Sequence, residues 1–136
     1  MSRSYRIIIA VCIGAALFLA VFMGMPDLGP NSAARKAAAQ TDISDIIRGL
    51  GEFRVDYGRY PTTEEGLAAL IKRPLAIPAA QWRHAYLDMD RIPEDPWGRR
   101  YIYECPGKHH PDGFDVYSLG PNGKGGEEAI GNWMAP

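Results

Sequence analysis

Hydrophobic residues follow three different patterns along the chain. Residues 7–25 form an unbroken apolar run, IIIAVCIGAALFLAVFMGM, without a charged side chain. Between residues 43 and 57 the apolar positions recur at spacings of three and four, which is typical of one face of an amphipathic helix. Residues 100–105 and 114–119 are two short segments rich in β-branched and aromatic residues. The pattern predicts a membrane anchor followed by an α+β body.

The apolar run predicts a transmembrane anchor over residues 1–25. At about 1.5 Å per residue, a helix of this length approaches the roughly 30 Å hydrocarbon core of a bilayer. A cleaved signal peptide is the alternative, but its apolar region is usually shorter and ends in small residues, whereas Phe22 and Met25 are bulky. Cys12 follows valine, which argues against a lipoprotein anchor. Arg3 and Arg6 favour a cytoplasmic N-terminus, so we expect the body to lie outside the cytoplasmic membrane.

A long helix is predicted after a hinge at residues 26–31, which holds two prolines and a glycine. Asn31 or Ser32 can cap this helix, and Gly58 takes the position of a left-handed cap residue at its end. The alanine-rich stretch 33–39 leaves open whether it packs on its own domain or on a partner helix. The later apolar stripe is expected to face the core of the body: Ile43, Ile46, Ile47, Leu50, Phe53 and Tyr57.

The rest of the body, within residues 32–136, is predicted to contain a short helix and a hairpin. Thr62 and Glu65 fit a capping box at the start of the short helix, and Pro74 ends it. Residues 75–95 are expected to be irregular and held to the core by aromatic and aliphatic side chains. The polar residues 106–113 separate the two β-rich segments and predict an antiparallel hairpin. Trp133 is a candidate anchor for the returning chain.

Composition excludes several functions. The chain has 15 basic and 16 acidic residues, so its bulk charge does not favour a nucleic-acid partner. Cys12 would lie in the membrane and Cys105 in the body, so no disulfide framework is expected.

Catalytic motifs are sparse. The adjacent His109 and His110 are interpreted as a solvated turn, Ser118 has no partner at a motif spacing, and Asp95-Pro96-Trp97-Gly98 is interpreted as a tight turn with a buried indole. We expect no enzyme; a small periplasmic hydrolase is the least favoured alternative.

One loop carries candidate site chemistry. Ser118–Ile130 is rich in glycine, and Asn122, Glu127 and Glu128 offer the oxygen donors that calcium prefers. The alternative is a polar loop that holds no ion.

The order of these landmarks resembles the major pseudopilin family of type II secretion. The segment DYGRYPTTEEGLAAL at residues 56–70 is similar to the signature that follows the long helix in that family. The segments DPWG at 95–98, FDVYSLG at 114–120 and IGNW at 130–133 match in order and approximate spacing. The resemblance covers residues 33–133. It implies a pilin-like α+β fold, in which a long N-terminal helix packs on a small antiparallel sheet.

The resemblance also implies function, partners and location. It implies a structural subunit of a periplasmic pseudopilus that exports folded proteins, with other pseudopilins and inner-membrane secretion components as partners. The protein would be a single-pass inner-membrane protein whose C-terminal domain faces the periplasm. An accessory or regulatory pilin-like protein that stays monomeric is the alternative within the same fold.

Two departures from the family pattern change the expectations. Family members carry a leader ending in glycine, then Phe-Thr-Leu-Ile-Glu or a close variant; neither Gly14 nor Gly24 is followed by such a sequence. We therefore expect the apolar segment to be retained, and no long homopolymeric fibres to form when the chain is overproduced alone. The family's calcium loop uses a leucine carbonyl and two aspartates. The matching positions are Leu119, Asn122 and Glu128, which implies weaker calcium binding than two aspartates would give.

Overall fold

The computed structural model describes residues 31–134. The predicted anchor, residues 1–25, and the predicted hinge apart from Asn31 lie outside the described residues. Among residues 31–134, no helix combines the length and the apolar character that crossing a bilayer requires.

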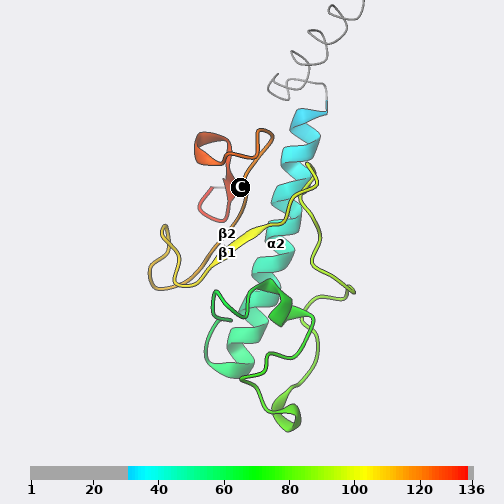
Figure 1. The fold of residues 1–136 in the computed structure, drawn as a ribbon, viewed down its shortest axis with the longest axis vertical. Helices are drawn as coiled ribbons and strands as arrows, with labels where there is room; N and C mark the ends of the chain where they lie inside the picture. The colour runs from blue at the N-terminus through cyan, green and yellow to red at the C-terminus, as the bar shows by residue number, and fades with distance from the viewer. Residues whose placement is uncertain (1–30, 135–136) are drawn as a thin grey trace, which may run out of the picture.

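The long helix, α2, spans Ser32–Tyr57 (Figure 1). Gly58 ends it with a φ of 70°, and its N–H donates to the carbonyl of Arg54 at 2.7 Å, which confirms the predicted left-handed cap. The predicted N-terminal cap is right in its position but not in its hydrogen bonding. Asn31 occupies the cap position with φ −93° and ψ 0°, and its side chain makes no capping hydrogen bond. This helical backbone differs from the extended one that lets a cap side chain reach the next amides.

The apolar stripe of α2 faces the body, as predicted. The buried side chains begin at Ala39 and recur along one face of the helix at Ile43, Ile46, Leu50 and Phe53. Gly49 lies on the same face, where a Cβ would approach the Leu87 side chain to 3.3 Å. The stripe forms one core with the sheet and the irregular segment.

The predicted short α-helix is wrong: the segment is a single 3₁₀ turn, η1, at Leu67–Leu70. The capping box itself forms. The Glu65 N–H donates to Thr62 Oγ1 at 3.2 Å, and the Thr62 N–H donates to Glu65 Oε2 at 2.8 Å. Gly66 then adopts φ 60° and ψ −169°, a conformation outside the helical region, so an α-helix cannot continue through it.

Three antiparallel strands form the sheet in the order β1-β2-β3. They are β1 (Ile102–Glu104), β2 (Asp115–Ser118) and β3 (Ile130–Gly131). Tyr103 pairs with Val116 in the first ladder and Ser118 with Ile130 in the second. The predicted hairpin is confirmed with shorter strands, while the two-residue β3 was not predicted.

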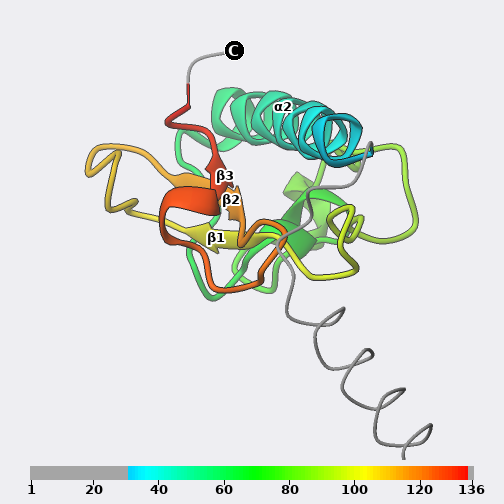
Figure 2. The same cartoon turned by 90° about the horizontal axis from the view of Figure 1, so that it is seen from above.

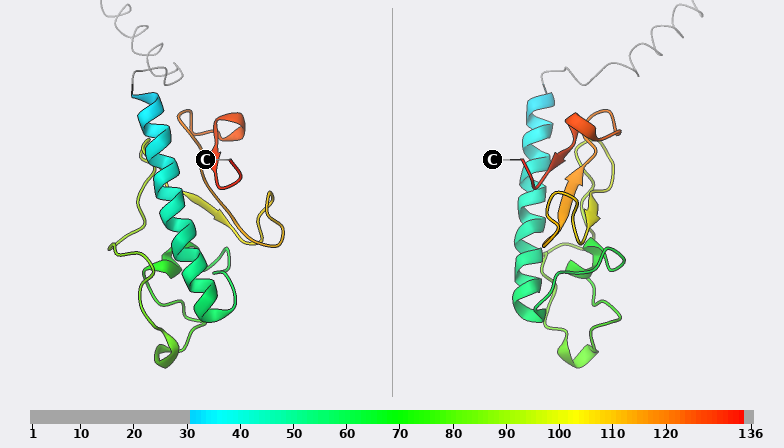
Figure 3. Two further views of the ribbon diagram at one scale, coloured as in Figure 1. Left: turned by 180° about the vertical axis from the view of Figure 1, so that it is seen from behind. Right: turned by 90° about the vertical axis from the view of Figure 1, so that its left-hand side faces the viewer.

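The body has two layers. Seen from above, α2 forms one layer and the strands the other (Figure 2). The side view in Figure 3 places the sheet and the loops on one side of α2, and its opposite face is left uncovered.

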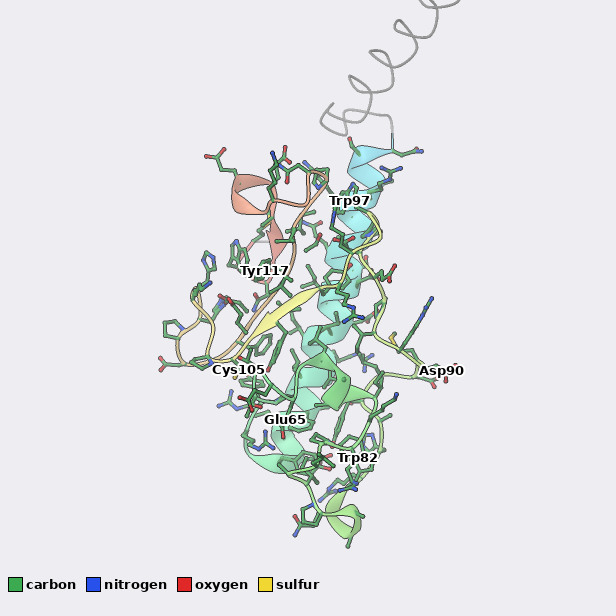
Figure 4. All side chains as sticks on the ribbon, viewed as in Figure 1. Glu65, Trp82, Asp90, Trp97, Cys105 and Tyr117 are labelled. Carbon is green, nitrogen blue, oxygen red and sulfur yellow. The ribbon has the colours of Figure 1, made fainter. Side chains whose placement is uncertain are left out.

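The irregular segment packs on the core through aromatic and aliphatic side chains, as predicted, and includes a 3₁₀ turn, η2, at Ala79–Gln81. The Tyr86 N–H donates to the Leu70 carbonyl at 2.6 Å, and Trp82 stacks on Tyr57 at the end of α2 (Figure 4).

Candidate functional site

The turn at residues 95–98 is organised by a buried aspartate. Asp95 is 3% exposed, and its Oδ1 accepts hydrogen bonds from the Trp97 N–H at 3.0 Å and the Arg99 N–H at 2.9 Å. The Gly98 N–H closes the turn on the Asp95 carbonyl at 2.8 Å. The predicted tight turn is confirmed, although the Trp97 indole, labelled in Figure 4, is half-buried instead of buried.

Ser118 connects this turn to the sheet. Its hydroxyl is fully buried and donates to Asp95 Oδ2 at 2.6 Å, while its Oγ accepts from the Gly120 N–H at 3.0 Å. The two partners lie 23 positions apart, so no spacing motif could reveal them. Because the hydroxyl is closed off from solvent and both of its hydrogen-bonding roles are taken by the fold, the arrangement is structural.

The glycine-rich loop begins at Leu119, directly after β2. Gly120 has φ 77°, and a Cβ there would collide with the backbone carbonyl of Glu128. The loop therefore folds back so closely that only glycine fits at its start. The Gly125 N–H donates to the Leu119 carbonyl at 3.0 Å, and the 3₁₀ turn η3 (Gly126–Glu128) leads into β3.

The three predicted calcium ligands lie on this loop in different states. Glu128 packs against Gly120, beside Leu119, and its Oε2 is buried without a hydrogen-bond partner. The Leu119 carbonyl accepts one hydrogen bond and keeps a second lone pair. Asn122 is exposed, and its Oδ1 accepts from the Lys124 N–H at 2.7 Å. The fold brings the backbone of Glu128 against Gly120, the residue after Leu119, whereas Asn122 is engaged in its own turn.

The donor atoms of these residues suit a hard cation. All three donors are oxygens, as calcium prefers, and Glu128 supplies the one formal negative charge. A buried carboxylate oxygen without a partner is costly, and a cation would satisfy it. Over residues 31–134, no group of three or more histidine, cysteine or acidic side chains could hold a metal. Any ion at this loop would therefore depend on backbone and amide oxygens in addition to the Glu128 carboxylate.

The hairpin tip is more structured than predicted. Asp115 is 1% exposed and accepts from the His109 N–H at 2.7 Å, and its Oδ1 lies 2.9 Å from His110 Nδ1. Burial acts to raise the pKa of Asp115, but the hydrogen bonds from His109 and His110 outweigh it and lower the pKa. Asp115 thus holds the backbone of His109 and the imidazole of His110, while both histidines remain exposed, which agrees with the predicted solvated turn. The missed residue is Asp115, which sequence reasoning treated as an ordinary strand position.

Trp133 does not anchor the chain to the core. Its indole is half-buried and stacks on His109 with ring centroids 3.9 Å apart, and the ring centroid of Tyr117, which is labelled in Figure 4, lies 5.2 Å from that of the indole. It therefore covers the outer side of the hairpin tip.

One pocket formed by residues 31–134 has a volume of about 730 Å³, and one lysine and two aspartates are its only charged groups; it is lined by Ile71, Lys72, Ala85, Leu87, Asp88, Met89 and Asp90. All three charged residues are exposed. The site with the most specific local structure is thus the glycine-rich loop.

Comparison with known proteins identifies the family. The family model described as "Type II secretion system (T2SS), protein G" matches residues 28–133. The chain belongs to this family. The type II secretion system core protein G of Pseudomonas aeruginosa is 38% identical over 133 residues, covering 93% of this chain and 87% of the relative. The protein of the same name from Escherichia coli K12 is 35% identical over 128 residues, covering 93% and 84%.

A solved structure supports the same fold. The major pseudopilin from the type 2 secretion system of enterohaemorrhagic Escherichia coli is 36% identical, with a TM-score of 0.66 over 80% of this chain and 92% of that one. The expected pilin-like α+β fold and the resemblance to major pseudopilins are confirmed. As a protein G family member, the chain is a structural, envelope-associated pseudopilin of type II secretion, and the family is not an enzyme family.

Proposed function

We propose that this protein G family member assembles through residues 33–38, at the start of α2, into a periplasmic pseudopilus, with other pseudopilins and inner-membrane secretion components as partners. The supporting observation is the burial pattern of α2. Residues 33–38 are exposed, whereas burial on the core begins at Ala39. Small side chains allow helices to approach closely, so this alanine-rich surface suits helix–helix packing. Residues 7–25 would anchor the chain once through the inner membrane, and the body acts by contact, without catalysis.

A charged substitution on the alanine-rich surface of residues 33–38 tests the proposed assembly. Ala38→Glu in the full-length chain should abolish cross-linked multimers in cells that carry the secretion apparatus, because a carboxylate in a helix–helix interface is desolvated. Ala80→Glu is the matched control, since Ala80 is equally an exposed alanine but lies on η2. Unchanged cross-linking of Ala38→Glu would contradict the proposal. A wild-type chain that stays monomeric would favour the accessory, non-polymerising alternative.

The glycine-rich loop is proposed to bind calcium through the Leu119 carbonyl, Asn122 Oδ1 and Glu128. The unpartnered Glu128 Oε2 supports this site. A ligand that binds only the folded state adds RT ln(1 + [L]/Kd), about 2.7 kcal/mol at 100 times Kd. For a body of roughly 100 residues this corresponds to a rise in Tm on the order of 10 °C.

Thermal unfolding of the full-length chain in millimolar calcium and in chelator measures this rise. Glu128→Gln should remove it, whereas Glu127→Gln, at the exposed neighbour, should keep it. Coincident wild-type curves would reject calcium binding.

A further inference from the structure

The side chain of Arg99 reaches from the turn at residues 95–98 into the glycine-rich loop. Its Nη1 donates to the Gly120 carbonyl at 2.9 Å, and its Nη2 lies 3.4 Å from the Pro121 carbonyl. Gly123 packs on the same guanidinium. It has φ 69°, and a Cβ there would lie 2.7 Å from Arg99 Nε and 2.8 Å from Cζ. The first half of the loop therefore wraps around a cation that belongs to the chain itself.

A closed ring of hydrogen bonds fixes the position of this guanidinium. The Arg99 N–H donates to Asp95 Oδ1, and Asp95 Oδ2 accepts from the Ser118 hydroxyl. Ser118 Oγ accepts from the Gly120 N–H, and the Gly120 carbonyl accepts from Arg99 Nη1. The Arg99 backbone is held a second time, because its carbonyl accepts from the Asp95 N–H at 2.7 Å. Turn and loop are thus bound to one another through both backbone and side chain.

We propose that Arg99 is the resident cation of the loop segment 119–125, and that it orders this segment without calcium. Glycine loses more backbone entropy on ordering than other residues, so a loop with this composition needs contacts to hold it. The guanidinium supplies two donors to carbonyls at the start of the loop and a surface on which Gly123 rests. Arg99 consequently lowers the dependence of the loop on calcium; this second statement rests on the calcium binding proposed above.

Cleavage by the lysine-specific protease Lys-C provides a local measure of loop order. Lys124 lies in the loop and is exposed, and Lys108 lies at the hairpin tip and serves as an internal reference. Removing an arginine does not change the sites of this protease. The full-length wild type, Arg99→Ala and Arg100→Ala would be digested in chelator, with cleavage at each lysine followed by mass spectrometry. Arg100 is the matched control, because it is the exposed neighbour and carries the same charge.

The expected result is faster cleavage at Lys124 in Arg99→Ala alone, by about tenfold, since hydrogen bonds to a charged group shift a local opening equilibrium by at least this factor. Cleavage at Lys108 should be the same in all three proteins. Equal rates at Lys124 in Arg99→Ala and wild type would overturn the proposal. Equal acceleration at Lys108 and Lys124 would also overturn it, because Arg99 would then stabilise the whole body and not the loop.

Repeating the digestion in millimolar calcium separates this proposal from calcium binding. Calcium should slow cleavage at Lys124 by a larger factor in Arg99→Ala than in wild type. Slowing by the same factor in both would overturn the link between Arg99 and calcium dependence. If calcium slows cleavage at Lys124 in neither protein, calcium binding at this loop is rejected, and so is the link between Arg99 and calcium dependence. The comparison in chelator then still decides whether Arg99 orders the loop.

Discussion

Substitution of Ser118 by alanine should be strongly destabilising. The Ser118 hydroxyl joins the turn at residues 95–98 to the glycine-rich loop, because it donates to Asp95 Oδ2 and accepts from the Gly120 N–H. Ser118→Ala removes both hydrogen bonds without adding volume. Asp95 and Gly120 are themselves buried, so water cannot easily replace the lost partner.

The magnitude follows from the two groups that lose their partner. A buried donor or acceptor left unsatisfied costs about 1–3 kcal/mol, and more when it is charged. For one carboxylate oxygen and one amide we expect the free energy of unfolding to fall by about 2–4 kcal/mol. In a body of roughly 100 residues, that corresponds to a decrease in Tm on the order of 10–20 °C.

Urea unfolding followed by tryptophan fluorescence measures this loss of unfolding free energy. The slope of the unfolding free energy against urea concentration should be the same in wild type and variant if the denatured state is unaffected. Ser44→Ala is the control, since the exposed Ser44 hydroxyl donates to the Gln40 carbonyl one helical turn earlier and should contribute less than about 0.5 kcal/mol. A loss of less than about 0.5 kcal/mol for Ser118→Ala would refute the assignment of this hydroxyl as the link between turn and loop.

Three further predictions concern other parts of the body. Two hydrogen bonds from Arg59 to Glu65, at 2.6 and 2.8 Å, lower the pKa of Glu65 below the ordinary value of 4.5, so its contribution is present above about pH 4.5 and is lost as the pH falls through the lower folded pKa. Glu65→Gln should therefore reduce Tm at pH 7 and show a smaller loss of Tm on acidification than wild type; parallel pH profiles would contradict this. Phe53→Ala removes a fully buried ring and should lower the free energy of unfolding by about 3–5 kcal/mol in urea, and a loss below about 1 kcal/mol would contradict its place in the core. The Tyr101 hydroxyl donates to Asp42 Oδ2 at 2.7 Å, so Tyr101→Phe should cost about 1–2 kcal/mol in wild type and almost nothing in an Asp42→Ala background; equal costs in both would exclude this pair.

Sequence patterns over a few neighbouring residues were sufficient to predict the elements with a regular hydrophobic period or a clear capping residue. The buried stripe of α2 follows the helical period from Ile43 to Phe53, and Gly58 ends the helix as its left-handed conformation requires. The capping box of Thr62 and Glu65 also formed as predicted. The α-helix expected after it did not, because Gly66 adopts a non-helical conformation that its composition alone does not specify.

The contacts that fix the candidate site lie between residues far apart in the sequence. Asp95 contacts Ser118 because the fold brings the turn beside β2, and the two segments that carry these residues, DPWG and FDVYSLG, do not by themselves reveal the contact across 23 positions. The same reason applies to Asp115: its carboxylate is buried only because the folded hairpin tip places His109 and His110 against it. The loop could be predicted as an oxygen-rich segment, but the path of the chain determines that Glu128 Oε2 lacks a partner and that Asn122 has one.

Burial along α2 separates the surface that folds the body from the surface left for assembly. Every fully buried side chain of α2 lies from Ala39 onward, and the core residues of the sheet belong to the same hydrophobic cluster as these side chains. Residues 33–38 are exposed and contain four alanines beside Arg35 and Lys36, so the monomer gains little stability from them. Alanine has the highest intrinsic helix propensity, which keeps this stretch helical without tertiary contacts. The chain can therefore present a preformed helical surface to a partner without altering its own core, and substitutions at Ala38 and at Phe53 should affect assembly and stability independently.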